Sequence, residues 1–234
     1  MFDHVTIGVS DLAASRRFYV EALGLPTHDG DYAEWGAFTI AAGDAPLTRN
    51  LNVGFGVEDR DAVDGWWNRM TEAGYPSDGE PGPRPQYNDT YYGAFVLDPD
   101  GNSVEAVHHR SSVARGIDHL WLRTRDVAAE KRFYETIAPV VGLRLVHDAP
   151  DKVRITDGEG SFTFVVGEPT EHVHLAFGAP DFAAVERFHD ALTAAGYRSN
   201  GEPGERPHYH PGYYGAYVFD PDGHNVEAVF RDRP

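Results

Sequence analysis

The chain consists of two similar halves, and this internal repeat is the feature that most limits how it can fold. Residues 91–107 and residues 213–229 match almost residue for residue, and both contain the run Asp-Pro-Asp-Gly followed by Val-Glu-Ala-Val. The starts of the halves also match, as Asp-His-Val and Asp-His-Leu. We therefore expect two homologous domains of two modules each, residues 1–110 and 116–234. The polar segment at residues 109–115 is expected to link them.

Each half contains two units with the same order of elements. A strand of alternating apolar and polar residues is followed by a helix with an apolar stripe and then by further strands. In the second half we expect helices at residues 127–137 and 182–195. A single unit has too few strands to bury both faces of a sheet, so the four units should pair into curved sheets. This predicts an α+β fold whose helices cover the convex faces and whose concave faces are left for ligands.

Composition excludes several classes of protein. The formal net charge of −17 argues against nucleic-acid binding, which depends on basic residues. No apolar run approaches the roughly 18 residues of a transmembrane helix. Cysteine is absent, which excludes disulfides, thiolate catalysis and cysteine-bound metals. No signal peptide is visible at the start of the sequence, so a cytoplasmic protein with a small-molecule partner is the default expectation.

Residues 216–230 are predicted to form a β-hairpin around Asp220-Pro221-Asp222-Gly223. Proline presets a turn, aspartate bonds the local main chain, and glycine accepts the left-handed conformation. Alternation places Glu227 on the face opposite Val226 and Ala228. A carboxylate in the middle of a strand is costly unless something pairs with it, and a metal ion is our hypothesis.

Two further strands of the second half present histidines toward the same hollow. His119 and His174 both point away from the apolar face of their strands, as Glu227 does. Two imidazoles and one carboxylate can occupy one face of a metal's coordination sphere and leave positions open for substrate and oxygen. The residues thus predict a divalent metal site made by His119, His174 and Glu227.

The first half provides an internal comparison. Its counterparts of the three ligands are His4, Asn52 and Glu105, and an amide is a poor ligand for a transition metal. Gln86 and Asn88 likewise stand where the second half has His208 and His210. The first domain is therefore expected to lack metal and to serve as scaffold.

These motifs resemble the vicinal oxygen chelate superfamily, which includes glyoxalase I, bleomycin resistance proteins and type I extradiol dioxygenases. The resemblance covers nearly the whole chain and implies four βαβββ modules paired into two curved mixed-sheet half-barrels. The chain is similar to extradiol dioxygenases in having four modules and an asymmetric site, which implies Fe(II) or Mn(II), with Zn(II) or Ni(II) as alternatives. By this resemblance His208 would stabilise bound oxygen or substrate, Tyr217 would bind a substrate oxygen, and His210 is a candidate for proton transfer.

The chain also departs from these relatives. Extradiol enzymes carry an acid–base histidine in the strand that closes the third module, and residues 161–166 contain none. A glyoxalase-type site adds a second glutamate at the position of Thr163. Modules can also pair between halves, in which case His4 replaces His119 as the third ligand. Similarity to the four-module dioxygenases favours His119.

Three functions remain open. A metal-dependent dioxygenase of extradiol type is preferred, and a glyoxalase-like isomerase or lyase would use the same metal as a Lewis acid. The third is a metal-free protein that binds a drug or metabolite in an aromatic hollow; candidates to line it are Trp121, Tyr209, Tyr213 and Tyr214. A homodimer is compatible with each function. The remaining histidines predicted to lie at the surface are His28, His147, His189 and His224.

Overall fold

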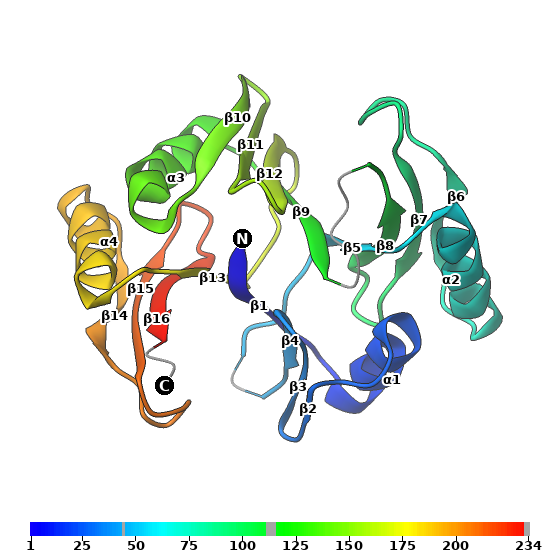
Figure 1. The fold of residues 1–234 in the computed structure, drawn as a ribbon, viewed down its shortest axis with the longest axis horizontal. Helices are drawn as coiled ribbons and strands as arrows, with labels where there is room; N and C mark the ends of the chain where they lie inside the picture. Colours follow the sequence, from blue (N-terminus) through cyan, green and yellow to red (C-terminus); the bar gives the residue numbers. More distant parts are fainter. Residues whose placement is uncertain (44, 111–115, 232–234) are drawn as a thin grey trace.

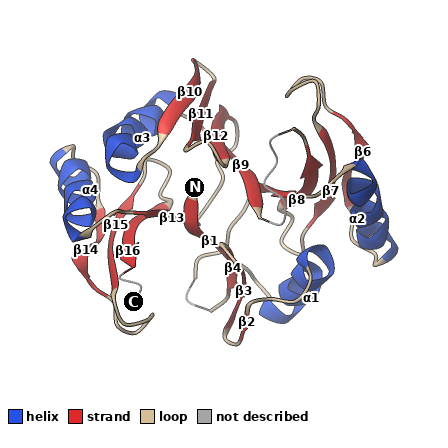
Figure 2. Cartoon of the chain, viewed as in Figure 1, coloured by secondary structure: helices blue, strands red, loops and turns tan. Residues whose placement is uncertain are grey.

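The structure is a computed structural model that describes residues 1–43, 45–110 and 116–231. Within these residues it contains sixteen strands and four helices, arranged as four βαβββ modules (Figures 1 and 2). The first module is β1 Phe2–Gly8, α1 Leu12–Leu23, β2 His28–Asp29, β3 Tyr32–Trp35 and β4 Phe38–Ala41. The second is β5 Asn52–Gly56, α2 Arg60–Glu72, β6 Ser77–Pro83, β7 Tyr92–Leu97 and β8 Ser103–His108. The third is β9 Ile117–Thr124, α3 Val127–Val141, β10 Arg144–Ala149, β11 Lys152–Thr156 and β12 Ser161–Val166. The fourth is β13 Val173–Gly178, α4 Phe182–Ala194, β14 Ser199–Glu205, β15 Tyr213–Phe219 and β16 Asn225–Arg231.

The modules form two eight-stranded mixed sheets, and each sheet combines both halves of the sequence. One sheet has the order β14-β15-β16-β13-β1-β4-β3-β2, and the other has the order β10-β11-β12-β9-β5-β8-β7-β6. The α+β fold of four βαβββ modules is thus confirmed, and the sheets are open rather than closed barrels. The expectation that modules pair within each half is wrong, because the first module pairs with the fourth and the second with the third. The ranges 1–110 and 116–234 describe the sequence repeat, and residues 111–115 of the expected linker lie outside the described residues.

The strands at the centre of each sheet are joined in the same way. Antiparallel pairing of β1 with β13 places Thr6 opposite His174. Parallel pairing of β13 with β16 places Ala176 opposite Glu227. The same face of three adjacent strands therefore carries the ligand-type side chains, while Val5 and Ile7 on the other face of β1 are fully buried.

Helices of one half pack on each other, whereas the sheets join the halves. Each helix begins at an aspartate whose carboxylate accepts a hydrogen bond from the main-chain N–H three residues later, and these residues are Asp11, Asp59, Asp126 and Asp181. In the second half, Phe133 of α3 stacks edge-on against Tyr197, which follows α4, with ring centroids 4.9 Å apart. In the first half, the Trp66 indole of α2 donates a hydrogen bond to the carbonyl oxygen of Ala22 in α1. Figure 1 shows the helices around the outside of the molecule.

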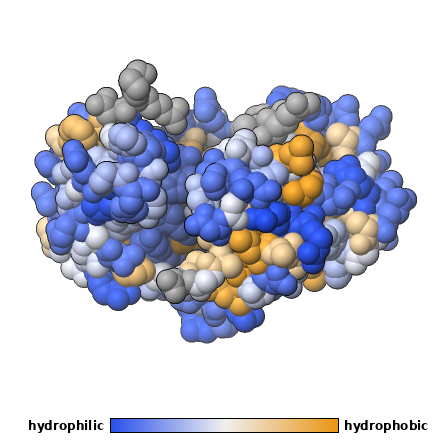
Figure 3. All heavy atoms as spheres, turned by 90° about the horizontal axis from the view of Figure 1, so that it is seen from below, coloured by the Kyte–Doolittle hydropathy of each residue, from blue (hydrophilic) through white to orange (hydrophobic). Residues whose placement is uncertain are grey.

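The two predicted Asp-Pro-Asp-Gly hairpins are confirmed. The carboxylate of Asp98 accepts from the main-chain N–H groups of Asp100 and Asn102, and Gly101 has a φ of 85°. Several edge strands were not predicted, among them β10, because their residues lack a clear alternation. Among the described residues no helix is long and apolar enough to cross a membrane. Hydrophilic residues cover most of the face drawn in Figure 3, around a smaller group of hydrophobic residues.

Candidate metal centre

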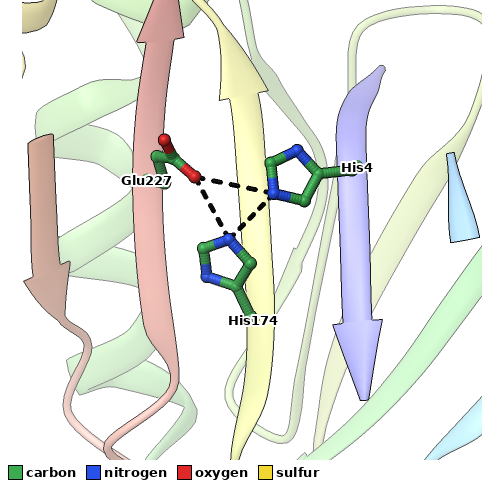
Figure 4. Close-up of side chains that lie close together, drawn as sticks. All are labelled: His4, His174 and Glu227. Carbon is green, nitrogen blue, oxygen red and sulfur yellow. Dashed lines mark hydrogen bonds and ion pairs between the residues drawn. The ribbon is translucent and has the colours of Figure 1, made fainter. Parts of the chain in front are cut away.

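Three ligand-type side chains converge on the concave face of the first sheet. The Nε2 atoms of His4 and His174 lie 3.0 Å apart, and Glu227 Oε2 lies 3.1 Å from His174 Nε2 and 3.6 Å from His4 Nε2 (Figure 4). These atoms come from β1, β13 and β16, which are neighbours in the sheet. Within the described part of the chain, His4, His174 and Glu227 form a group that could hold one metal ion.

Hydrogen bonds fix both imidazole rings with Nε2 facing the cluster. His4 Nδ1 lies 2.8 Å from the Asp3 carboxylate, and His174 Nδ1 lies 2.9 Å from the main-chain oxygen of Asn225. In the tautomer whose Nδ1–H donates to this oxygen, the Nε2 of each ring keeps its lone pair. A histidine that ligates a metal generally has such a partner on its other nitrogen. The two rings are therefore held as metal ligands require.

The carboxylate of Glu227 is also held in place. Its side chain is 1 % exposed, and its Oε1 accepts a hydrogen bond of 2.7 Å from the hydroxyl of Tyr213. Gly215 leaves room for it, since a Cβ built there would lie 2.5 Å from Glu227 Oε1. The remaining oxygen, Oε2, faces the two histidines. Burial of this charge is costly without a positive partner, and the cluster offers the place for one.

The spacing of the three atoms fits a divalent metal ion. Ligand atoms about 2.1 Å from a shared ion lie about 3.0 Å apart when they are neighbours in an octahedron. The observed separations of 3.0, 3.1 and 3.6 Å are close to this value. Imidazole nitrogens with one carboxylate suit iron, manganese, zinc or nickel, and the set does not select one of them.

Two side chains of opposite charge, Asp3 and Arg231, lie beside His4. The guanidinium of Arg231 forms a two-pronged contact with the Asp3 carboxylate, and Arg231 Nη1 lies 3.3 Å from His210 Nε2. Burial alone would raise the pKa of Asp3, but its hydrogen bonds to His4 and Arg231 lower it. The sequence did not predict that Asp3 and Arg231 would contact the cluster, although an Asp-His pair at the start of both halves was a visible signal. Tyr213 was expected to line a hollow but not to bond Glu227.

The cluster lies in a cavity of about 820 Å³. The three residues predicted to be catalytic, His208, His210 and Tyr217, all line it. The hydroxyl of Tyr217 is buried close to Glu227 and Tyr213, and it makes no hydrogen bond of ordinary geometry to the described residues. Burial and the charge of Glu227 raise the pKa of Tyr217, so this phenol stays protonated. His208 is exposed and stacks beside Tyr209, with ring centroids 4.3 Å apart.

His119 does not join this cluster. It lies in the second sheet, where its Nε2 is 3.1 Å from Glu105 and its Nδ1 is 3.0 Å from Asp118. The preference for His119 depended on pairing within each half, which the sheets contradict. Burial opposes a charge on His119, but the hydrogen bonds to Asp118 and Glu105 outweigh it and raise the pKa to about 9. A protonated imidazole thus stands where the first sheet has its metal-type cluster, and Asn52 of the neighbouring strand stands at the position of His174.

Thr39 stands at the position from which a fourth ligand would come. Thr39 pairs with Thr6, which lies two residues after the ligand His4. Glu227 has the same relation to His174, because it pairs with Ala176, two residues after that histidine. In the second sheet Thr163 has the same place relative to His119. The first sheet therefore offers three protein ligands rather than four, and β4 contains neither a histidine nor a glutamate.

Two of the histidines predicted to lie at the surface are buried. His224 is fully buried and accepts a hydrogen bond from the main-chain N–H of Val173, and burial lowers its pKa to about 4. His189 is 4 % exposed and pairs with the hydroxyl of Ser199. His28 and His147 are exposed, as predicted.

The proposed aromatic hollow is divided between the two sheets. Tyr209 and Tyr213 line the cavity of the first sheet, and Trp121 lines a separate cavity in the second. Tyr214 lies outside both and packs edge-on against Phe182.

Paired βαβββ modules with ligand-type side chains on a concave face define the vicinal oxygen chelate class of proteins. The family model described as the Glyoxalase/Bleomycin resistance protein/Dioxygenase superfamily matches residues 1–106 and 116–228, and the chain belongs to this superfamily. No curated protein sequence matches the chain.

Solved structures with the same fold include glyoxalase I from Zea mays, with 20% sequence identity and a TM-score of 0.72 over 98% of this chain and 92% of that one. The 2,3-dioxygenase LapB from Pseudomonas sp. KL28 matches over 98% of this chain and 91% of that one, with 18% identity and a TM-score of 0.45. The maize protein is similar in fold, and this similarity carries no statement about activity.

Proposed function

We propose that the protein is a metal-dependent enzyme that acts on a small organic substrate, and that it is a dioxygenase of extradiol type. The observation that supports this most is the three-ligand set of His4, His174 and Glu227, with Thr39 at the fourth position. Three protein ligands leave about three coordination positions open. A substrate with two neighbouring oxygens and one O₂ molecule together need three positions.

A divalent iron or manganese ion bound by these residues would supply Lewis acidity and electron transfer between an electron-rich diol and O₂. The chain's own residues would do the rest. Asp3 and Asn225 hold the two imidazoles in one tautomer, and Tyr213 holds the carboxylate. Among the described residues the hydroxyl of Tyr217 makes no hydrogen bond of ordinary geometry, and it is the group that would donate a hydrogen bond to a substrate oxygen.

His208 and His210 are placed to move protons. Both line the cavity, and His208 is exposed to solvent, so it can exchange a proton with water and with a group inside. His210 is half-buried, and its Nε2 lies 3.3 Å from the guanidinium of Arg231. His208 is therefore our candidate acid–base residue, and His210 is a second candidate for proton transfer.

The test is oxygen consumption by the metal-loaded protein with catechol and 3-methylcatechol. Extradiol cleavage places both atoms of one O₂ in the ring-opened product, so we expect equal amounts of oxygen used and product formed. The Glu227→Gln variant should lose this activity, and His119→Ala should keep it. Isomerisation of the glutathione–methylglyoxal adduct without oxygen uptake would instead support the glyoxalase-like alternative. Ligand binding that needs neither a metal nor Glu227 would support the metal-free binding protein.

A further inference from the structure

The second sheet contains a cavity of about 450 Å³ at the place that corresponds to the metal-type cluster of the first. We call it the twin pocket. Its floor carries Asn52, Glu105 and His119 in place of His174, Glu227 and His4. Asn52 stands where the first sheet has its second histidine, and the described residues of the twin pocket do not form a metal-type ligand set.

Strand register shows which residues of the two pockets are equivalent. Val5 pairs with Phe38 in the first sheet, and Leu120 pairs with Phe162 in the second. The neighbouring strands continue this correspondence, with Glu34 opposite Thr39 and Arg154 opposite Thr163. Three equivalent positions of the two pockets differ in charge. The first sheet has Gly8, Tyr32 and Glu34 there, and the second sheet has Arg123, Lys152 and Arg154, in the same order.

The three cations of the twin pocket have no acidic partner. Within the described residues, none of Arg123, Lys152 and Arg154 forms an ion pair with a carboxylate. Arg123 donates one hydrogen bond of 3.0 Å to the main-chain oxygen of Asn50, and the Lys152 ammonium lies 4.6 Å from the ring centre of Trp121. Since the chain has 37 acidic and 20 basic residues, three unpaired cations at one pocket are unexpected without a function.

The acidic residues of the pocket are already engaged. Glu105 accepts from the hydroxyl of Tyr91 and contacts His119. Asp118 lies 3.0 Å from His119 and from His109. Asp78 accepts a hydrogen bond from the hydroxyl of Ser103. The donors of Arg123, Lys152 and Arg154 are therefore available to a ligand.

A fourth cation, Arg84, serves the fold. Its guanidinium donates to the main-chain oxygen of Glu80, as that of its counterpart Arg206 does to Glu202. Because this brace occurs in both halves, it does not distinguish the pockets.

One wall of the twin pocket is aromatic. The rings of Tyr87 and Trp121 lie 5.7 Å apart, and Tyr87 is 46 % exposed. Large aromatic side chains at the mouth of a pocket are suited to contact a flat apolar group. Guanidinium and ammonium groups bind carboxylates and phosphates with charge-assisted hydrogen bonds.

We infer that the twin pocket is a second ligand site, which binds a small organic anion through Arg123, Lys152 and Arg154 and packs the body of that anion on Trp121. The anionic group is a carboxylate or a phosphate. This site is distinct from the metal-type cluster, and its occupation requires no metal.

Calorimetric titration of the full chain with benzoate and with phenyl phosphate tests the inference and separates the two anions. We expect saturable binding of at least one of them at low salt and none of benzyl alcohol, which has the same ring without the charge. Restoring the first-sheet residues, as Lys152→Tyr and Arg154→Glu, should weaken binding roughly tenfold or more for each lost cation. Addition of salt should weaken binding as well.

Arg144→Glu is the matched control, because Arg144 is an exposed residue of the neighbouring strand β10 and does not line the pocket. It should bind the anions as the wild type does, and so should His174→Ala, which alters only the other pocket. The inference is overturned if neither anion shows saturable binding up to about 10 mM. It is also overturned if His174→Ala abolishes binding while Arg154→Glu, folded as judged by its circular dichroism, leaves it unchanged.

Discussion

His4 and His174 are 170 positions apart in the sequence, yet their Nε2 atoms lie 3.0 Å apart. Each belongs to a different half, and the pairing of β1 with β13 brings them together. Glu227 completes the cluster from the strand on the other side of β13. The candidate metal centre is thus built across the repeat, and its ligands can be tested against residues of equal type in the second sheet.

Replacing His4 by alanine should remove the bound metal, whereas replacing His119 should not. His4 supplies one of three converging ligand atoms, and loss of one ligand should weaken metal binding by well over tenfold, since even the loss of a supporting partner costs roughly that much. Elemental analysis after dialysis gives the metal content per chain. His119→Ala is the matched control, because its ring belongs to the twin pocket. Full metal content in His4→Ala would contradict the assignment.

Gly215→Ala should disturb the metal-type cluster although the residue itself is not a ligand. The new Cβ would lie 2.5 Å from Glu227 Oε1, so the carboxylate would have to move. We expect metal affinity to fall roughly tenfold or more. Gly93→Ala makes the same change in the second sheet, where the Cβ would lie 2.3 Å from Glu105 Oε1. It should reduce stability but leave metal affinity unchanged, and equal effects of both variants on affinity would disprove the prediction.

Tyr217→Phe should lower turnover more than metal content. The hydroxyl is buried, makes no hydrogen bond of ordinary geometry to the described residues, and has a raised pKa, so it is a donor available to a substrate. Removing one such donor costs about 100- to 1000-fold in kcat. The natural counterpart in the other half is Phe95, which shows that the ring alone is compatible with the fold. Tyr214→Phe, on the same strand but outside the cavity, is the control for general effects on folding.

Glu130→Gln should make the protein less sensitive to alkaline pH. Glu130 is fully buried in α3, and burial together with the charges of Asp220 and Asp222 raises its pKa well above the ordinary value for a glutamate. In the unfolded chain this carboxyl ionises near its ordinary value of 4.5. The folded state therefore binds more protons between these values. Its contribution to stability is complete below about pH 4.5 and is lost progressively as the pH rises toward the raised pKa of the folded state.

The free energy of unfolding is measured by urea denaturation at several pH values from about pH 5 to about pH 9. The variant should lose less stability than the wild type over this range, by about 1–3 kcal/mol. Glu135→Gln, at an exposed position of the same helix, should follow the wild type. Parallel curves for wild type and Glu130→Gln would show that Glu130 is ionised in the folded protein.

Local patterns were sufficient to predict the modules and to select His174 and Glu227, two members of the metal-type cluster. Alternation in β1 and β13 determines which face carries His4 and His174, and the turn at Asp220 determines how Glu227 returns into the sheet. The sequence repeat predicted four modules, because segments of similar sequence form similar structures. His208, His210 and Tyr217 line the cavity that contains Glu227, and their catalytic roles stay a prediction.

The choice between His4 and His119 could not be made from local sequence. Both follow an aspartate at the start of a half-buried strand, and their strands are equally apolar on the buried face. The choice depends on which sheet edge each strand joins, and that is decided by packing over the whole chain rather than by any one segment. The burial of His224 escaped prediction for a related reason, since its partner, the N–H of Val173, lies 51 positions away.

Each sheet combines modules from both halves of the sequence, so neither sheet can be completed before the second half has been synthesised. β1 is made before β13 and lies between β4 and β13, so one of its edges has no partner until residue 173 has been made. The first half therefore leaves the ribosome with an open sheet edge that the second half must close. Because Glu227 comes later still, the nascent chain cannot acquire its metal-type cluster before nearly all of the described residues have been added.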